Sequence, residues 1–190
     1  MQTLPSFESF AAGHGAGRPQ VVWTTLVSDL ETPVSAMLKL ADGRPNSFLF
    51  ESVEGGATRG RYSFIGMKPD LVWRCRGGKA EINRRARVDS EQFEPCAEAP
   101  LAALRQLIAE SHIDVPEQLP PMAAGLFGYM GYDMVRLMER LPDKNPDVLQ
   151  VPDAILLRPT VIAIFDNIGD VVTVVTPVWP RAGLDARAAY

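Results

Sequence analysis

Cysteine and histidine are scarce in this chain of 190 residues, with two of each. Cys75 and Cys96 are far apart and form no Cys-x-x-Cys motif, so the sequence predicts neither a disulfide framework nor a thiolate metal site. We expect reduced thiols and a cytoplasmic protein. Arginines flank Cys75, but no histidine or second cysteine is near it in sequence, so we predict a structural thiol. Neither His14 nor His112 has other ligands at metal-binding spacing, and we predict no metal site.

Long apolar runs and an excess of positive charge are also missing. No run approaches the roughly 20 residues that a membrane-spanning helix needs, and the first residues lack the pattern of a secretory signal. The net charge is −4, whereas phosphate binding requires a concentration of Lys and Arg. The basic residues between Arg74 and Arg87 are predicted to be the solvated face of a hairpin. We therefore expect neither a membrane nor a nucleic acid as partner.

Motifs that carry chemistry by themselves are absent. There is no P-loop, Gly-x-Ser-x-Gly or metalloprotease helix, so we predict no catalytic or cofactor-binding residue in this chain. Glycines recur at every third position in residues 125–131, which differs from a dinucleotide-binding loop and favours close packing of backbones in a strand. Helical spacing predicts a stripe of core methionines at Met130, Met134 and Met138.

What is present indicates an ordinary soluble domain. The chain is 46% hydrophobic and 22% charged, and its length suffices for one domain, residues 1–190. Thr32-Pro33 predicts a helix start, and Gly77-Gly78 predicts a hairpin turn. Further helices are predicted in residues 4–12, 101–108 and 132–141, and strands in residues 20–27, 47–52, 61–66, 71–76, 79–83, 154–157, 160–166 and 171–178. This order predicts an α+β fold with a mainly antiparallel sheet and interspersed helices.

Four segments, in this order, resemble the amino-terminal domain of the large subunit of anthranilate synthase. They are Ser-Phe-Leu-Phe-Glu-Ser at 47–52, Gly-Arg-Tyr-Ser-Phe-Ile-Gly at 60–66, Gly-Leu-Phe-Gly-Tyr-Met-Gly-Tyr-Asp at 125–133, and Val-Pro-Asp-Ala at 151–154 leading to Thr-Val-Ile-Ala-Ile-Phe-Asp at 160–166. The first is similar to the family's Leu-Leu-Glu-Ser element, with Phe50 in place of the second Leu. Together they span nearly the whole chain. The segment at 60–66 favours anthranilate synthase over its relative aminodeoxychorismate synthase, and isochorismate and salicylate synthases are more distant.

The resemblance implies an activity for the full-length protein. Family members convert chorismate and ammonia to anthranilate and pyruvate, using Mg²⁺ and a glutamine amidotransferase partner that supplies the ammonia. Tryptophan, the end product of the pathway, inhibits them. The chorismate and Mg²⁺ residues belong to the carboxy-terminal part of the family, which nothing here matches. Residues 184–190 have a helical pattern that stops abruptly. We therefore expect a chain truncated before the catalytic domain, and inactive by itself.

The resemblance also places half of the tryptophan inhibition site in this chain, at Phe50, Glu51, Ser52 and Arg61. Arg61 is the nearest match to a basic residue that follows a variable loop. Glu51 can bind the ligand's ammonium, Arg61 or Ser52 its carboxylate, and Phe50 its indole ring. In a regular strand Phe50 and Ser52 share a face and Glu51 points away. A bulge, a strand end or a backbone group must therefore complete the site.

Two alternative functions remain open at this point. The first is aminodeoxychorismate synthase, which an assay of the full-length product would distinguish. The second is a stand-alone amino-acid-binding module, which predicts saturable tryptophan binding by these 190 residues alone. We also expect that strands 154–157 and 171–178 leave open edges or apolar surface that the missing half would cover.

Overall fold

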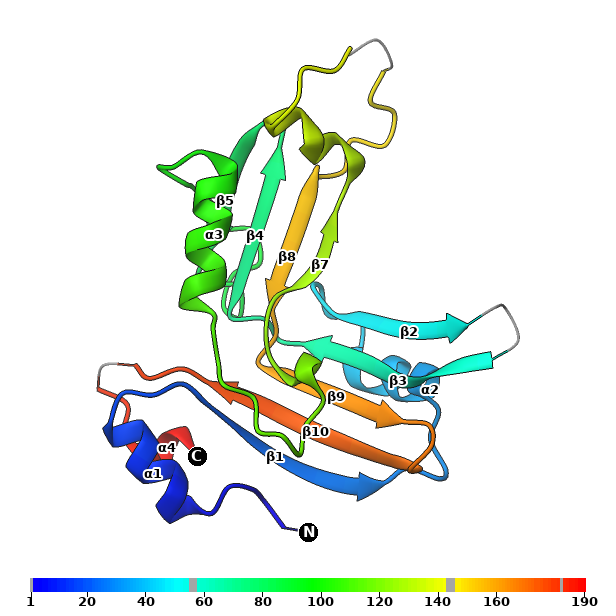
Figure 1. Ribbon diagram of the computed structural model, residues 1–190, viewed down its shortest axis with the longest axis vertical. Coiled ribbons are helices and arrows are strands. Elements are labelled where there is room, and N and C mark those ends of the chain that lie inside the picture. Colours follow the sequence, from blue (N-terminus) through cyan, green and yellow to red (C-terminus); the bar gives the residue numbers. More distant parts are fainter. Residues whose placement is uncertain (1, 55–57, 143–145, 182) are drawn as a thin grey trace. The chain divides into compact units, whose positions relative to one another are not determined.

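The computed structural model describes residues 2–54, 58–142, 146–181 and 183–190, with the backbone alone for 52–54, 58 and 59 (Figure 1). The chain forms two compact units. Unit 1 comprises Met1–Pro69, His112–Gly125 and Pro159–Tyr190, and unit 2 comprises Asp70–Ser111 and Leu126–Arg158. Each contains a five-stranded antiparallel sheet. The α+β class with antiparallel strands and interspersed helices is confirmed, with two sheets.

The sheet of unit 1 has the strand order β1-β10-β9-β3-β2. The strands are β1 (Gln20–Val27), β10 (Val171–Val178), β9 (Val161–Asp166), β3 (Thr58–Met67) and β2 (Phe48–Glu54). Two of the four neighbouring pairs, β2-β3 and β9-β10, are consecutive in sequence, and the other two are not. β1 pairs with β10 and β3 pairs with β9, so the sheet depends on contacts between distant parts of the chain.

Helix α2 (Pro33–Ala41) covers part of one face of this sheet. Its Ala36 packs in a core with Ile65 and Phe165, among other side chains. The predicted start is confirmed, because the Thr32 hydroxyl accepts the Ser35 backbone N–H and the Ser35 hydroxyl accepts the Thr32 N–H. The cap fixes where α2 begins, and this end of the helix lies at the candidate site.

Two further helices of unit 1 pack against each other. They are α1 (Phe7–Gly15) and the short α4 (Ala186–Ala189). Phe10 is fully buried, and the Tyr190 ring lies 5.3 Å from its ring, centroid to centroid. The Tyr190 hydroxyl also donates to the carbonyl of Pro5 at 2.9 Å. A short 3₁₀ turn (Pro121–Ala123) lies in the middle segment of the unit.

The sheet of unit 2 has the strand order β6-β5-β4-β8-β7. Its strands are β6 (Glu94–Pro95), β5 (Lys79–Asn83), β4 (Leu71–Arg76), β8 (Ala154–Arg158) and β7 (Phe127–Met130). The predicted hairpin around Gly77-Gly78 is β4-β5. Helix α3 (Pro100–Glu110) lies beside β4 and β5 (Figure 1). Its Leu104 and Leu107 belong to the same core cluster as Trp73, which is fully buried.

The predicted methionine stripe is wrong. Met134 is buried, but Met130 and Met138 are 52% and 68% exposed. A 3₁₀ turn (Tyr132–Leu137) stands where a helix to residue 141 was predicted. The reason is a contact with a distant residue: the Gly131 N–H donates to the Asp153 carbonyl, which holds the chain in an extended path just before the turn. The three methionines therefore do not share one face of an α-helix.

Close backbone packing at Gly128 is confirmed. A Cβ atom at this position would lie 1.9 Å from the carbonyl oxygen of Ile155 on β8. A Cβ at Gly131 would lie 3.0 Å from the Asp153 oxygen, whereas one at Gly125 would meet no atom within 4 Å. Gly128 therefore lets β7 approach β8, and Gly131 lets the chain just after β7 approach Asp153.

The expectation of open edges at residues 154–157 and 171–178 is wrong. β8 lies between β4 and β7, and β10 lies between β1 and β9, so both strands are paired on both sides. Val175 on β10 and Ala154 and Leu157 on β8 are buried, whereas most other residues of these two strands are partly exposed. The edge strands of the two sheets are β1, β2, β6 and β7.

Candidate functional site

The predicted ligand residues lie where β2 and β3 lose their regular register. Glu51 pairs with Ser63, but Val53, two residues later, pairs with Arg59. Two steps along β2 therefore match four steps along β3, and the surplus residues form a β-bulge beside Ser52. Of the three possibilities expected at this point, a bulge, a strand end or a backbone group, the structure has the bulge.

Phe50 presents an aromatic surface on one face of this edge strand. Its ring lies 4.6 Å from that of Phe48, centroid to centroid, and the residue is 42% exposed. Phe48 itself lies over Gly66, where a Cβ would come within 2.2 Å of the ring. The packed pair leaves Phe50 accessible to the apolar part of a ligand.

Glu51 and Ser52 continue the strand. Glu51 is exposed and forms no hydrogen bond or ion pair with the side chains that the structure describes. Because strand residues alternate, Glu51 points to the face opposite Phe50. The structure therefore does not bring these two side chains together on one face. The backbone of Ser52 belongs to β2, but its side chain lies outside the described residues.

Arg61 lies in the bulge and is held by Asp166 at the end of β9. Its Nη2 donates to Asp166 Oδ2 at 2.8 Å, and its Nε lies 3.2 Å from both carboxylate oxygens. The Arg61 side chain is 54% exposed, whereas that of Asp166 is 16% exposed. The guanidinium also lies over the ring of Tyr62, 4.8 Å from its centroid. Arg61 is therefore oriented by its neighbours while part of it faces solvent.

Asp166 is a site residue that sequence reasoning missed. The Arg61 guanidinium, and then the backbone N–H groups of Ile168 and Gly169, lower its pKa to about 2, against an opposing effect of burial. The aspartate before a short polar turn signals such backbone bonds. Its ion pair with Arg61 has no local signal, because the two residues are 105 positions apart.

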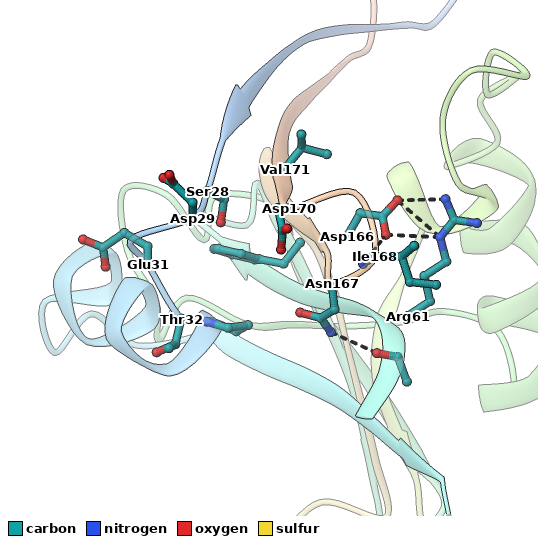
Figure 2. A pocket seen from close by; sticks show the side chains of 13 residues that line it. Ser28, Asp29, Glu31, Thr32, Arg61, Asp166, Asn167, Ile168, Asp170 and Val171 are labelled. Carbon is teal, nitrogen blue, oxygen red and sulfur yellow. Dashed lines mark hydrogen bonds and ion pairs between the residues drawn. The ribbon is translucent and has the colours of Figure 1, made fainter. Parts of the chain in front are cut away.

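A cavity of about 430 Å³ opens beside this ion pair (Figure 2). Its walls come from the segment before α2, the bulge in β3 and the turn between β9 and β10. Phe165, Pro33 and Val171 supply apolar surface. The polar lining is formed by Ser28, Asp29, Glu31, Thr32, Arg61, Asp166, Asn167 and Asp170. The shape and mixed lining suit a small molecule with an apolar part and charged ends.

Negative charge dominates the cavity, with four carboxylates against the single guanidinium of Arg61. Glu31 is bonded to Ser35 and Lys39, and these contacts lower its pKa. Asp29 and Asp170 make no side-chain hydrogen bond or ion pair within the part of the chain that the structure describes. The cavity therefore favours a cationic group such as an ammonium.

Of the three predicted ligand residues whose side chains the structure describes, one lines this cavity. Arg61 does so, whereas Phe50 and Glu51 lie on β2, on the other side of β3. Sequence reasoning also missed the contribution of Asp29 and Glu31. The one signal for them was the helix start at Thr32, because acidic residues commonly precede or begin helices.

Other candidate chemistry is limited in the described part of the chain. No group of three or more His, Cys, Asp or Glu among these residues is arranged to hold a metal ion. No described helix has the length and apolar character needed to cross a membrane. Cys75 is buried, and burial raises the pKa of its thiol, which fits the predicted structural role. The neighbouring Arg74 instead lies over the ring of Phe93 and pairs with Glu81.

Comparison with known proteins supports one family. The chain is 57% identical over 187 residues, 98% of its length, to anthranilate synthase component 1 of Cereibacter sphaeroides. It is 40% identical over 156 residues to the protein of that name from Thermus thermophilus, and 34% identical over 206 residues to the one from Pseudomonas aeruginosa. The chain belongs to the anthranilate synthase component 1 family.

The match covers part of these anthranilate synthase chains. Our chain spans 37%, 31% and 41% of the three relatives. A crystal structure of anthranilate synthase component I from Streptococcus pneumoniae aligns with 83% of our chain, and the alignment covers 31% of the crystallised chain. The sequence identity is 19% and the TM-score is 0.49. No protein-family profile matches the sequence.

Proposed function

We propose that the full-length protein is the large subunit of an anthranilate synthase, and that this chain is its amino-terminal, regulatory part. The similarity over 98% of the chain to a protein of that name carries this proposal. The enzyme would convert chorismate and ammonia to anthranilate and pyruvate in tryptophan biosynthesis. Aminodeoxychorismate synthase is not favoured, because the relatives reported above all bear the anthranilate synthase name.

The proposed reaction requires more than this chain provides. We propose that a glutamine amidotransferase subunit delivers the ammonia in the cytoplasm. The ligands of Mg²⁺ and the chorismate site would lie in the part of the relatives that this chain does not span. The 190-residue chain would therefore contribute regulation and structure, without catalysis of its own.

We further propose that tryptophan binds at the open edge of β2, near the bulge in β3. Arg61 uses Nε and Nη2 on Asp166, which leaves its Nη1 N–H groups for the ligand's carboxylate. Glu51 would bind the ammonium and Phe50 the indole. These side chains point to opposite faces, but a ligand at an edge strand can reach both faces around the open edge. Ser52 would complete the site.

The test is an assay of the purified full-length protein with chorismate, ammonia and Mg²⁺. We expect fluorescent anthranilate to form, and tryptophan to suppress its formation. Aminodeoxychorismate as the product would overturn the assignment. Turnover that tryptophan does not affect would overturn the regulatory role. Saturable tryptophan binding by the 190-residue chain alone would instead favour a self-contained amino-acid-binding module.

A further inference from the structure

Three of the four residues at which the chain enters or leaves unit 2 meet in one cluster. Unit 2 begins at Asp70, its first segment ends at Ser111, and its second segment ends at Arg158. Arg158 donates from Nε to Asp70 Oδ1 at 2.9 Å and from Nη2 to Asp70 Oδ2 at 3.0 Å. Its Nη1 donates to the Ser111 hydroxyl at 3.3 Å. One guanidinium thus joins three chain ends that are distant in sequence.

The cluster is buried. The Asp70 and Arg158 side chains are 6% and 12% exposed, and Ser111 is 5% exposed. The Asp70 backbone N–H also donates to the Arg158 carbonyl at 3.1 Å. Removing one partner of a buried bidentate pair leaves an uncompensated charge in a poorly solvated place. The cluster therefore strongly disfavours any state in which its members separate.

Unit 2 contains a second bidentate pair that differs mainly in exposure. Arg84 donates to both carboxylate oxygens of Glu110, at 2.7 and 3.0 Å. These side chains are 54% and 29% exposed, and pairs in contact with solvent contribute little to stability. The pair provides a control, because it also joins an arginine to a carboxylate through two hydrogen bonds, but in a more exposed place and without contacting Arg158.

The chain is also fixed just outside unit 2. The Thr160 hydroxyl donates to the Lys68 carbonyl at 2.8 Å, and both of these residues belong to unit 1. Between them and the cluster lie Pro69 and Pro159, both buried. Each of these two crossings therefore contains a proline with a restricted φ angle. Two neighbouring contacts therefore hold segments 68–70 and 158–160 together: the Thr160 bond to Lys68 and the Arg158 pair with Asp70.

We propose that Asp70, Ser111 and Arg158 form a clasp that closes unit 2 on itself, so that unit 2 opens as one cooperative unit, separately from unit 1. Opening of unit 2 separates Arg158 from Asp70 and Ser111 and leaves buried charges without partners, so the clasp stabilises the closed state. The clasp lies next to the β4-β8 ladder, because β4 begins at Leu71 and β8 ends at Arg158. Opening of unit 2 therefore exposes the amides of β4 and β8, which adjoin the clasp.

Hydrogen exchange of the full-length protein, read by mass spectrometry of peptides, tests this. In Asp70→Asn we expect exchange in β4 and β8 to accelerate tenfold or more, while β1 and β10 change less than threefold. In the control Glu110→Gln we expect less than threefold change in either unit. In Ser111→Ala, which removes one hydrogen bond and no charge, we expect a smaller acceleration confined to unit 2.

Two results would overturn the proposal. If hydrogen exchange in Asp70→Asn accelerates equally in unit 1 and unit 2, the two units open together as one body. An effect of Asp70→Asn no larger than that of Glu110→Gln would show that the cluster has no special role. If Asp70→Asn does not fold, Ser111→Ala decides, and acceleration that is absent or spread over both units overturns the proposal.

Discussion

The ion pair between Arg61 and Asp166 ties the bulge in β3 to the end of β9. The depressed pKa of Asp166, about 2, means that the folded state favours its charged form. Such a group stabilises the fold above the pKa of the unfolded chain, about 3.9, and loses this contribution as the pH falls toward 2. The contribution is reduced by solvent around the exposed Arg61.

We predict that Asp166→Asn lowers the free energy of unfolding by about 1–2 kcal/mol at pH 7, after discounting the pKa shift for solvent screening. The difference from the native chain should persist down to about pH 4 and be mostly lost near pH 2, where about half of the folded chains carry a protonated Asp166. Urea unfolding at a series of pH values measures it. Asp114→Asn, at a fully exposed side chain, serves as the control. A difference that survives undiminished at pH 2 would mean that lost turn geometry, and not charge, is responsible.

Glu51 and Ser52 give the prediction that tests the inhibitor site. Replacing Glu51 by Gln, or Ser52 by Phe, should weaken tryptophan inhibition of the full-length enzyme. The loss of a charge-assisted hydrogen bond costs roughly 1.5–3 kcal/mol, which corresponds to about ten- to a hundredfold in inhibitor affinity. Steady-state kinetics with and without tryptophan measure the effect, with Glu91→Gln in unit 2 as the control. Unchanged inhibition in both variants would remove the two residues from the site. A large loss of turnover without tryptophan would show that they support the fold.

Residue-level reasoning succeeded where a motif was local and failed where a partner was distant. Arg61 was selected from the segment that contains it and its role as a ligand stays a prediction, and strand alternation at Phe50–Ser52 called for a bulge, a strand end or a backbone group, of which the structure has the bulge. Asp166 was not predicted as its partner, because pairing between β3 and β9 depends on strand order that no local pattern encodes. The acidic lining around Asp29 was missed for the same reason.

At the scale of elements, the approach of β7 to β8 gives a further prediction. Gly128→Ala should destabilise unit 2 by about 1–3 kcal/mol, because the new methyl would overlap the Ile155 carbonyl. Gly15→Ala in α1 is the matched control: its Cβ meets nothing within 4 Å, so we expect no loss. Thermal unfolding followed by circular dichroism compares the two variants. Equal stability of both would show that β7 adjusts at no cost.

Elements were predicted well where their signals are contained in a few residues. The cap at Thr32 and the turn at Gly77-Gly78 fixed α2 and the β4-β5 hairpin. The methionine spacing failed because bonds from Gly131 to Asp153 override it. The division into two sheets was not predicted either, since period-2 patterns reveal strands without revealing their neighbours.

At the scale of the whole molecule, we predict that the 190-residue chain has no anthranilate synthase activity. No segment of it resembles the chorismate or Mg²⁺ residues of the family, and the chain spans 37% of its relative from Cereibacter sphaeroides. The measurement is anthranilate formation from chorismate and ammonia by the purified chain. Activity above background would require a catalytic site within these residues and would contradict the prediction.

We also predict that the isolated 190-residue chain self-associates. The edge strands β2 and β7 offer unpaired backbone groups, and Phe50, Tyr129 and Met130 on them are 42–52% exposed. Sedimentation velocity at increasing concentration, together with binding of a hydrophobic dye, measures the association. A chain that stays monomeric at high concentration and binds little dye would contradict this.

β1 and β10 are neighbours in the sheet but far apart in the sequence, which affects folding during synthesis. β1 pairs with β10, and Thr25 on β1 bonds to Thr173, which lies 148 positions later. A ribosome adds about 5–20 residues per second, so β1 waits roughly 7–30 s for this partner. Every residue of unit 2, from Asp70 to Arg158, is synthesised within that wait. Unit 2 can therefore fold on the nascent chain while β1 still needs protection, and slow translation after Arg158 would lengthen the period in which chaperones must shield that strand.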